Sequence, residues 1–167
     1  MISGPESSGK TTLFKALCDV YSIKGVSEYA RDYIANLDRA YKYNDILKIA
    51  EQQFINEQQY LEMKQPFFLA DSDLLTLEIW CEFKYGKCHT FISENLRNHL
   101  PEIYLLCYPD IKWEYDPQRE NPNDRLALFD IYESKIKSFG VDYLILRGDK
   151  PDRLKSAKTI INRIANS

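Results

Sequence analysis

The chain has 167 residues, which fits one compact domain that buries about 70% of the surface exposed by its unfolded form. Apolar residues make up 44% and charged residues 28%, and the formal net charge of −3 provides no global basic field for nucleic acid or an anionic membrane. Since no apolar run approaches the ~20 residues that span a bilayer and no signal segment opens the sequence, we expect a cytoplasmic protein without nucleic-acid or membrane partners.

Helical and extended patterns alternate along the whole sequence, which is typical of an α/β fold with a parallel sheet flanked by helices. Short apolar runs predict five strands, at residues 1–3, 25–27, 67–70, 103–108 and 141–146. Apolar periodicity predicts helices at residues 10–21, 30–37, 44–64, 74–83, 91–98, 124–139 and 152–166. Asn44, Asp73 and Asp124 are the expected N-caps of three of these helices. We expect a five-stranded parallel sheet in the order 2-3-1-4-5, within a single domain that covers residues 1–167.

The most specific motif is Gly-Pro-Glu-Ser-Ser-Gly-Lys-Thr at residues 4–11, which matches the phosphate-binding loop (P-loop) of P-loop NTPases. Its glycines let the backbone N–H groups curl toward phosphate oxygens, and the N-terminus of the following helix adds partial positive charge. Lys10 provides a cation for the β and γ phosphates, and the Thr11 hydroxyl is a candidate Mg²⁺ ligand. The motif therefore predicts ATP or GTP, with Mg²⁺, as cofactors. The predicted nucleotide-binding residues are Gly4, Glu6, Ser7, Ser8, Gly9, Lys10, Thr11 and Thr12.

A carboxylate follows the apolar run at residues 67–70, as in P-loop proteins that place an acid beside the metal. We expect Asp71 to act there together with Thr11; the alternative is a turn residue or a helix cap, a role that fits Asp73 better. A regulatory GTPase would carry glycine where Leu74 stands, and would contain the guanine-reading Asn-Lys-x-Asp tetrad, which the sequence lacks. The sequence therefore favours an ATP-dependent small-molecule kinase.

Residues 109–125 form the expected lid, an irregular stretch with three prolines after an apolar strand. Its arginines, Arg119 and Arg125, are candidates for stabilising charge on the transferring phosphoryl group, because a guanidinium can bind several phosphoryl oxygens. The alternative is a solvated surface loop.

Glu28 and Arg31 follow the second predicted strand and should lie at the same sheet edge as the P-loop. Glu28 can orient or deprotonate an acceptor hydroxyl and Arg31 can bind phosphate; an ordinary ion pair at the helix start is the alternative. Asp73 is a further candidate substrate contact. Aromatic residues that can stack on a planar base, or simply pack, are Trp80, Trp113, Tyr29, Tyr41 and Tyr43.

This combination resembles the ribosylnicotinamide kinase domain of bacterial NAD-biosynthesis regulators and its single-domain relatives. The resemblance covers nearly the whole chain and rests on residues 4–11, 28–31, 71–76, 85–87 and 113–125. It implies ATP- and Mg²⁺-dependent phosphorylation of a nucleoside, nicotinamide riboside, at its 5′-hydroxyl in NAD salvage, and an adenine site near residues 147–149. The other domains of the larger relatives are missing and the lid sequence at residues 113–119 differs. A nucleotide-dependent regulatory ATPase and a kinase for another nucleoside are therefore the alternatives.

Overall fold

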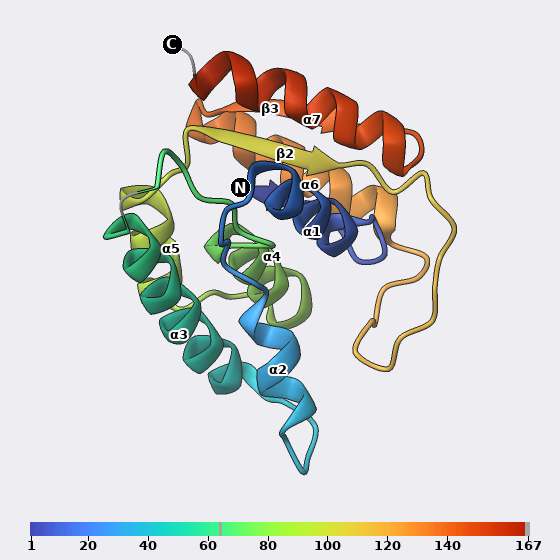
Figure 1. The fold of residues 1–167 in the computed structure, drawn as a ribbon. Helices are drawn as coiled ribbons and strands as arrows, with labels where there is room; N and C mark the ends of the chain where they lie inside the picture. The colour runs from blue at the N-terminus through green and yellow to red at the C-terminus, as the bar shows by residue number, and fades with distance from the viewer. Residues whose placement is uncertain (64, 166–167) are drawn as a thin grey trace.

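The computed structural model describes residues 1–63 and 65–165, which adopt an α/β architecture with a parallel sheet (Figure 1). In this part of the chain three strands pair side by side in the order β1 (Ile2–Ser3), β2 (Ile103–Cys107) and β3 (Asp142–Leu146). Both pairs are parallel, with Ile2 opposite Leu105 and Leu105 opposite Leu144. The predicted α/β class and parallel sheet are confirmed.

Helices make up most of the rest of the described chain. They are α1 (Lys10–Tyr21), α2 (Tyr29–Ala35), α3 (Tyr43–Leu61), α4 (Leu74–Tyr85), α5 (Thr90–Asn98), α6 (Arg125–Phe139) and α7 (Lys150–Ala165). Within residues 1–63 and 65–165, no helix combines the length and the apolar character needed to cross a membrane.

The described sheet has three strands rather than the predicted five, so the five-strand order is not confirmed. Segments 25–27 and 67–70 contribute only isolated parallel bridges, Val26 with Ala70 and Asp71 with Ile2. Their backbone groups do pair, since the Asp71 N–H donates to the Val26 carbonyl at 2.8 Å and the Ile2 N–H donates to the Ala70 carbonyl at 3.0 Å. The Ser72 N–H also donates to the Ile2 carbonyl at 3.0 Å, and the chain then turns at Ser72, which has a φ of +70°.

Helices cover both faces of the sheet, because alternate residues of β2 point to opposite sides. Leu105 and Cys107 pack in one apolar cluster with residues of α1 and α7. Tyr104 and Leu106 pack in a second cluster with residues of α3, α4, α5 and α6. Figure 1 shows α7 and α6 on either side of β2 and β3, and the lid as a long loop that leaves the end of β2.

Helix boundaries follow the predictions closely, with one wrong cap. The predicted N-cap Asn44 lies inside α3, which begins at Tyr43 after Lys42, because the Asp45 carboxylate accepts a hydrogen bond from the Lys42 N–H at 2.7 Å. Asp73 and Asp124 do occupy N-cap positions, of α4 and α6, although neither side chain makes a capping hydrogen bond. The predicted ends of two helices, Lys64 and Asn166, lie outside the described residues.

Candidate active site

A cavity of about 480 Å³ lies between the P-loop, α2, α4, α6 and the lid. It contains most of the predicted site residues on one continuous surface. From the P-loop, α2 and the lid, the lining residues include Gly4, Pro5, Glu6, Ser7, Ser8, Gly9, Lys10, Thr11, Thr12, Glu28, Arg31 and Arg119. From α4 they include Thr76, Ile79, Trp80, Phe83 and Lys84.

The P-loop backbone requires glycine at both ends. Gly4 has a φ of +136°, and a Cβ there would lie 2.6 Å from the Cys107 carbonyl oxygen of β2. Gly9 has a φ of +84°, which also disfavours any other residue. The Lys10 ammonium donates to the carbonyls of Gly4 at 2.9 Å and Pro5 at 3.0 Å, so the lysine folds back over the loop that precedes it. This arrangement is that of a phosphate-binding loop.

Thr11 and Asp71 offer oxygen ligands of the kind that Mg²⁺ prefers. Thr11 lines the cavity, whereas Asp71 is only 1% exposed, beside β1, the strand that leads into the P-loop. Within the described residues, the Asp71 Oδ1 atom has no hydrogen-bond partner, which is unfavourable for a buried carboxylate unless a further group binds it. The same part of the chain contains no cluster of three or more His, Cys, Asp or Glu residues that could hold a metal. These residues therefore fit a metal that takes few protein ligands and relies on phosphate and water oxygens, as Mg²⁺ does.

Glu28 is half-buried at the N-cap position of α2, and Arg31 lies one turn later in the same helix. The Arg31 Nε atom lies 3.9 Å from Glu28 Oε2, so this pair is loose. Burial raises the pKa of the Glu28 carboxyl, while Lys10 and Arg31 oppose the rise and the negative charge of Asp71 reinforces it. The predicted acceptor-side carboxylate is therefore electrostatically coupled to both the P-loop lysine and the metal-side aspartate.

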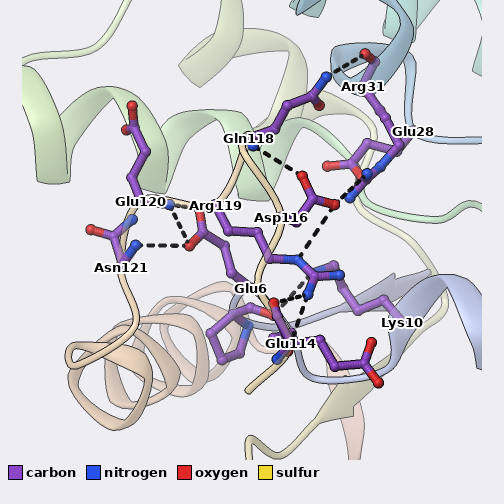
Figure 2. Close-up of polar contacts among 12 residues, drawn as sticks. Glu6, Lys10, Glu28, Arg31, Glu114, Asp116, Gln118, Arg119, Glu120 and Asn121 are labelled. Carbon is purple, nitrogen blue, oxygen red and sulfur yellow. Dashed lines mark hydrogen bonds and ion pairs between the residues drawn. The ribbon is translucent and has the colours of Figure 1, made fainter. Parts of the chain in front are cut away.

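The lid lies across the cavity and is bound to α2 and to the P-loop. Asp116 of the lid forms an ion pair with Arg31 at 2.8 Å and lies 3.9 Å from the Nε atom of Arg119 (Figure 2). Arg119 in turn donates to the Ser7 hydroxyl at 3.3 Å and to the Glu114 carbonyl at 2.5 Å. Arg119 therefore reaches the P-loop, as its predicted role requires.

Glu6 provides a second link between the P-loop and the lid. Its carboxylate accepts hydrogen bonds from the backbone N–H groups of Glu120, at 3.0 Å, and Asn121, at 2.9 Å (Figure 2). The Glu120 side chain continues the connection to α4, through an ion pair with Lys84 at 2.9 Å. Polar contacts thus hold the lid to three of the elements that line the cavity.

Four predicted site residues do not line this cavity among the described residues: the buried Asp71, and Arg125, Trp113 and Asp73. Arg125 opens α6 and donates to the carbonyls of Ser7 at 3.2 Å and Ile111 at 3.0 Å. Trp113 packs its ring against the guanidinium groups of the two lid arginines, 5.7 Å from that of Arg125. Asp73 accepts a hydrogen bond from the buried Tyr104 hydroxyl at 2.8 Å and borders a separate void of about 20 Å³.

Sequence reasoning missed two charged residues that the structure brings to the site. Lys84 lies one turn after Trp80 on α4, so helical periodicity from that tryptophan would have found it. Arg153 of α7 is buried against the back of the P-loop, where its guanidinium donates to the Ser8 carbonyl at 2.6 Å. No local pattern around Arg153 indicated this contact, because the two residues are far apart in the sequence.

Comparison with known proteins agrees with this geometry. Residues 1–153 match a protein family described as AAA domain. The trifunctional NAD biosynthesis/regulator protein NadR of Salmonella typhimurium strain LT2 is 25% identical over an alignment of 153 residues, which covers 86% of this chain and 36% of that protein. NadR of Escherichia coli strain K12 is 29% identical over an alignment of 124 residues, which covers 71% of this chain and 30% of that protein. The chain thus spans about a third of the length of these relatives, and the predicted resemblance to bacterial NAD-biosynthesis regulators is confirmed.

Proposed function

We propose that this chain, which belongs to the AAA domain family, is an ATP- and Mg²⁺-dependent kinase whose acceptor is nicotinamide riboside. The observation that carries the proposal is a single cavity lined by the P-loop, by Glu28 and by Arg119. Phosphoryl transfer needs a phosphate cradle, a group that orients the attacking hydroxyl and a cation for the developing charge. The P-loop provides the phosphate cradle, Glu28 the group that orients the hydroxyl, and Arg119 the cation.

The P-loop holds the triphosphate in this proposal. Lys10, which bonds to the carbonyls of Gly4 and Pro5, is within reach of phosphate oxygens that enter the loop. Thr11 and Asp71 would hold Mg²⁺, which neutralises negative charge on the phosphates when it is bound. Asp71→Asn should therefore weaken the Mg²⁺ dependence of nucleotide binding without unfolding the protein.

Glu28 and Arg119 act on the reacting groups. The acceptor oxygen forms a bond to the γ-phosphorus while the bond from that phosphorus to the bridging oxygen of ADP breaks. Glu28 orients the acceptor hydroxyl and takes its proton, and Arg119 stabilises the charge that builds on the phosphoryl oxygens. The closed lid keeps water from competing with the acceptor.

Two observations support nicotinamide riboside as the acceptor. The named relatives are NAD biosynthesis proteins. The cavity wall formed by α4 also presents Trp80 and Phe83, and the Glu28 carboxylate lines the same cavity. Aromatic faces and carboxylates suit a flat ring with a positive charge, as in a pyridinium.

An acceptor screen tests this function. Purified protein with ATP and Mg²⁺ is offered nicotinamide riboside, adenosine, cytidine, uridine, thymidine or water alone, and phosphorylated product is identified by mass. We expect nicotinamide mononucleotide, and we expect Lys10→Ala to abolish its formation while the protein stays folded. Product from another nucleoside would replace the acceptor but keep the kinase class. Slow ATP hydrolysis without any phosphorylated product would instead support the regulatory ATPase.

A further inference from the structure

Arg153 is a buried charge that none of the steps above uses. The residue lies in the first turn of α7, is only 3% exposed, and directs its guanidinium toward the P-loop. A buried guanidinium is unfavourable unless its N–H groups are satisfied, so its partners indicate why it is there.

Four partners of the Arg153 guanidinium belong to loops at the carboxyl edge of the sheet. Its Nη1 donates to the Ser8 carbonyl of the P-loop at 2.6 Å, and its Nη2 donates to the Tyr108 carbonyl just after β2 at 2.8 Å. Its Nε donates to the Gly148 carbonyl just after β3, also at 2.8 Å. An ion pair with Asp110, at the start of the lid, completes the set.

Asp110 closes this arrangement into a ring. Its second carboxylate oxygen accepts a hydrogen bond from the Gly148 N–H at 2.8 Å. Arg153 and Asp110 therefore connect the P-loop, the beginning of the lid and the turn after β3 through a charged pair at their common centre. The planar, five-donor guanidinium suits such a junction better than an ammonium group does.

The contact with Ser8 has a direct consequence for phosphate binding. A peptide group is planar and trans, so its C=O and its N–H point in opposite directions. The Ser8 carbonyl is directed at Arg153, and this orients the N–H of Gly9 away from Arg153. Gly9 lines the cavity, and the P-loop binds anions through such N–H groups.

We propose that Arg153 is a positioning residue that holds the Ser8–Gly9 peptide in its phosphate-binding orientation and couples it to the turn after β3. This role rests on the nucleotide site proposed above. Arg153 touches no phosphate in it, since its guanidinium bonds to carbonyl oxygens and to Asp110 behind the loop. The role requires the several separate N–H donors of the planar guanidinium and not merely a positive charge.

The test compares Arg153→Met and Arg153→Lys with a matched control, Lys155→Met, an exposed lysine on the same helix. Hydrogen exchange of the P-loop amides is measured without ligand, and tripolyphosphate affinity is measured with Mg²⁺, at a temperature well below each variant's melting point. For Arg153→Met we expect the exchange rate of the P-loop amides to rise at least roughly tenfold and the affinity for tripolyphosphate to fall by at least the same factor. The reason is that hydrogen bonds to a charged group are strong. Arg153→Lys should show most of both effects, and Lys155→Met neither.

A purely structural role would lower the melting temperature but leave the affinity and P-loop exchange of the folded protein unchanged, and that result overturns the proposal. Should Arg153→Met not fold, Arg153→Lys decides by the same two measurements. If the parent protein binds tripolyphosphate but phosphorylates no acceptor, the kinase proposal fails while the test of Arg153 stands. If the parent protein binds no tripolyphosphate, the proposed nucleotide site is wrong. The positioning role is still tested by hydrogen exchange, because P-loop amides that exchange at the same rate in the Arg153 variants as in the parent would refute it.

Discussion

The Glu28 carboxylate lies where burial and charge act in opposite directions on its ionisation. Burial raises its pKa, and Lys10 and Arg31 limit the rise. Only the ionised form can take a proton from the acceptor hydroxyl, so activity should be lost as the pH falls through this raised pKa. We therefore expect the acid limb of kcat/KM to lie at a higher pH than the pKa of an ordinary glutamate.

A pH profile of the parent and of Glu28→Gln measures this effect. The variant should retain nucleotide binding, lose most of its turnover and show no acid limb in its residual activity. Glu51→Gln, on an exposed position of α3, is the control and should match the parent throughout. An unchanged acid limb in Glu28→Gln would move the role of the base to another carboxylate, with Asp71 as the next choice.

Glu57 of α3 shows how a buried acid affects stability. Burial, together with the nearby Asp73, raises the pKa of Glu57 to about 8, and its carboxyl bonds to the Gln53 amide at 3.1 Å. A folded-state pKa above the ordinary value of 4.5 means that the folded protein holds the proton more tightly than the unfolded chain does. The contribution of protonated Glu57 to the free energy of unfolding is therefore fully present below about pH 4.5, and it is lost as the pH rises to about 8.

Glu57→Gln should remove this dependence, because glutamine keeps the hydrogen-bond acceptor and has no proton to lose. We expect its free energy of unfolding to match the parent at pH 5 and to exceed it at pH 8. Urea unfolding between pH 5 and pH 9 checks the difference, with Glu51→Gln as the exposed control on the same helix. Parallel pH curves for parent and Glu57→Gln would show that Glu57 is ionised in the fold.

The lid is an element held mainly by polar contacts, and Glu6 makes the most direct of them. Its carboxylate accepts the N–H groups of Glu120 and Asn121, and charge-assisted hydrogen bonds of this kind contribute about 1.5–3 kcal/mol each. Glu6→Ala should therefore speed hydrogen exchange at these two amides at least roughly tenfold. Glu114→Ala is the matched control, because Glu114 contacts Ser7 and Arg119 through its backbone. Equal exchange in parent and Glu6→Ala would mean that other contacts, such as the Lys84 to Glu120 pair, hold the lid.

Helices were predictable from the sequence where local signals define both ends. α1 has its predicted bounds, because the P-loop motif fixes its start and its apolar period places Leu13 and Leu17 in the core. The extended segments were less predictable. Val26, Leu69 and Ala70 are buried, as an apolar run implies, but the number of paired residues depends on where the chain turns. The left-handed turn at Ser72, a residue with no strong preference for positive φ, gave no signal in the sequence.

At the scale of the whole molecule, the candidate site was predictable where it is contiguous in the sequence. The P-loop is one motif, and the rule that parallel strands end at a common edge led from it to Glu28. Trp113 and Arg125 were assigned to the site because they lie in the predicted lid. The sequence of a lid does not say which way its side chains face, and neither residue lines the cavity. The contact of Arg153 with Ser8 joins positions 145 residues apart and arises only when α7 packs beside α1.

Ion pairs between residues far apart in the sequence also fix α4, which forms one wall of the cavity, to the neighbouring helices. The Glu78 side chain of α4 is fully buried and accepts from Arg97 of α5 at 3.0 Å and from Lys135 of α6 at 2.9 Å. Although burial favours its neutral form, these cations hold the pKa of Glu78 below its ordinary value. Glu78→Ala removes two charge-assisted hydrogen bonds but leaves Arg97, which is 51% exposed, and Lys135, which still pairs with Glu82. It should therefore lower the free energy of unfolding by about 1.5–3 kcal/mol.

Glu82 provides a matched control for Glu78, since it lies one turn later on α4 and pairs with the same Lys135 at 2.8 Å, but its side chain is 42% exposed. Exposed pairs contribute little, so Glu82→Ala should cost less than about 1 kcal/mol. Urea unfolding of both variants, followed by circular dichroism, measures the two free energies. If they were equal, the junction of α4, α5 and α6 would depend on apolar packing alone. If Glu78→Ala alone is destabilised, nucleotide binding should weaken with it as denaturant is added, because Thr76, Trp80 and Lys84 reach the cavity from the same helix.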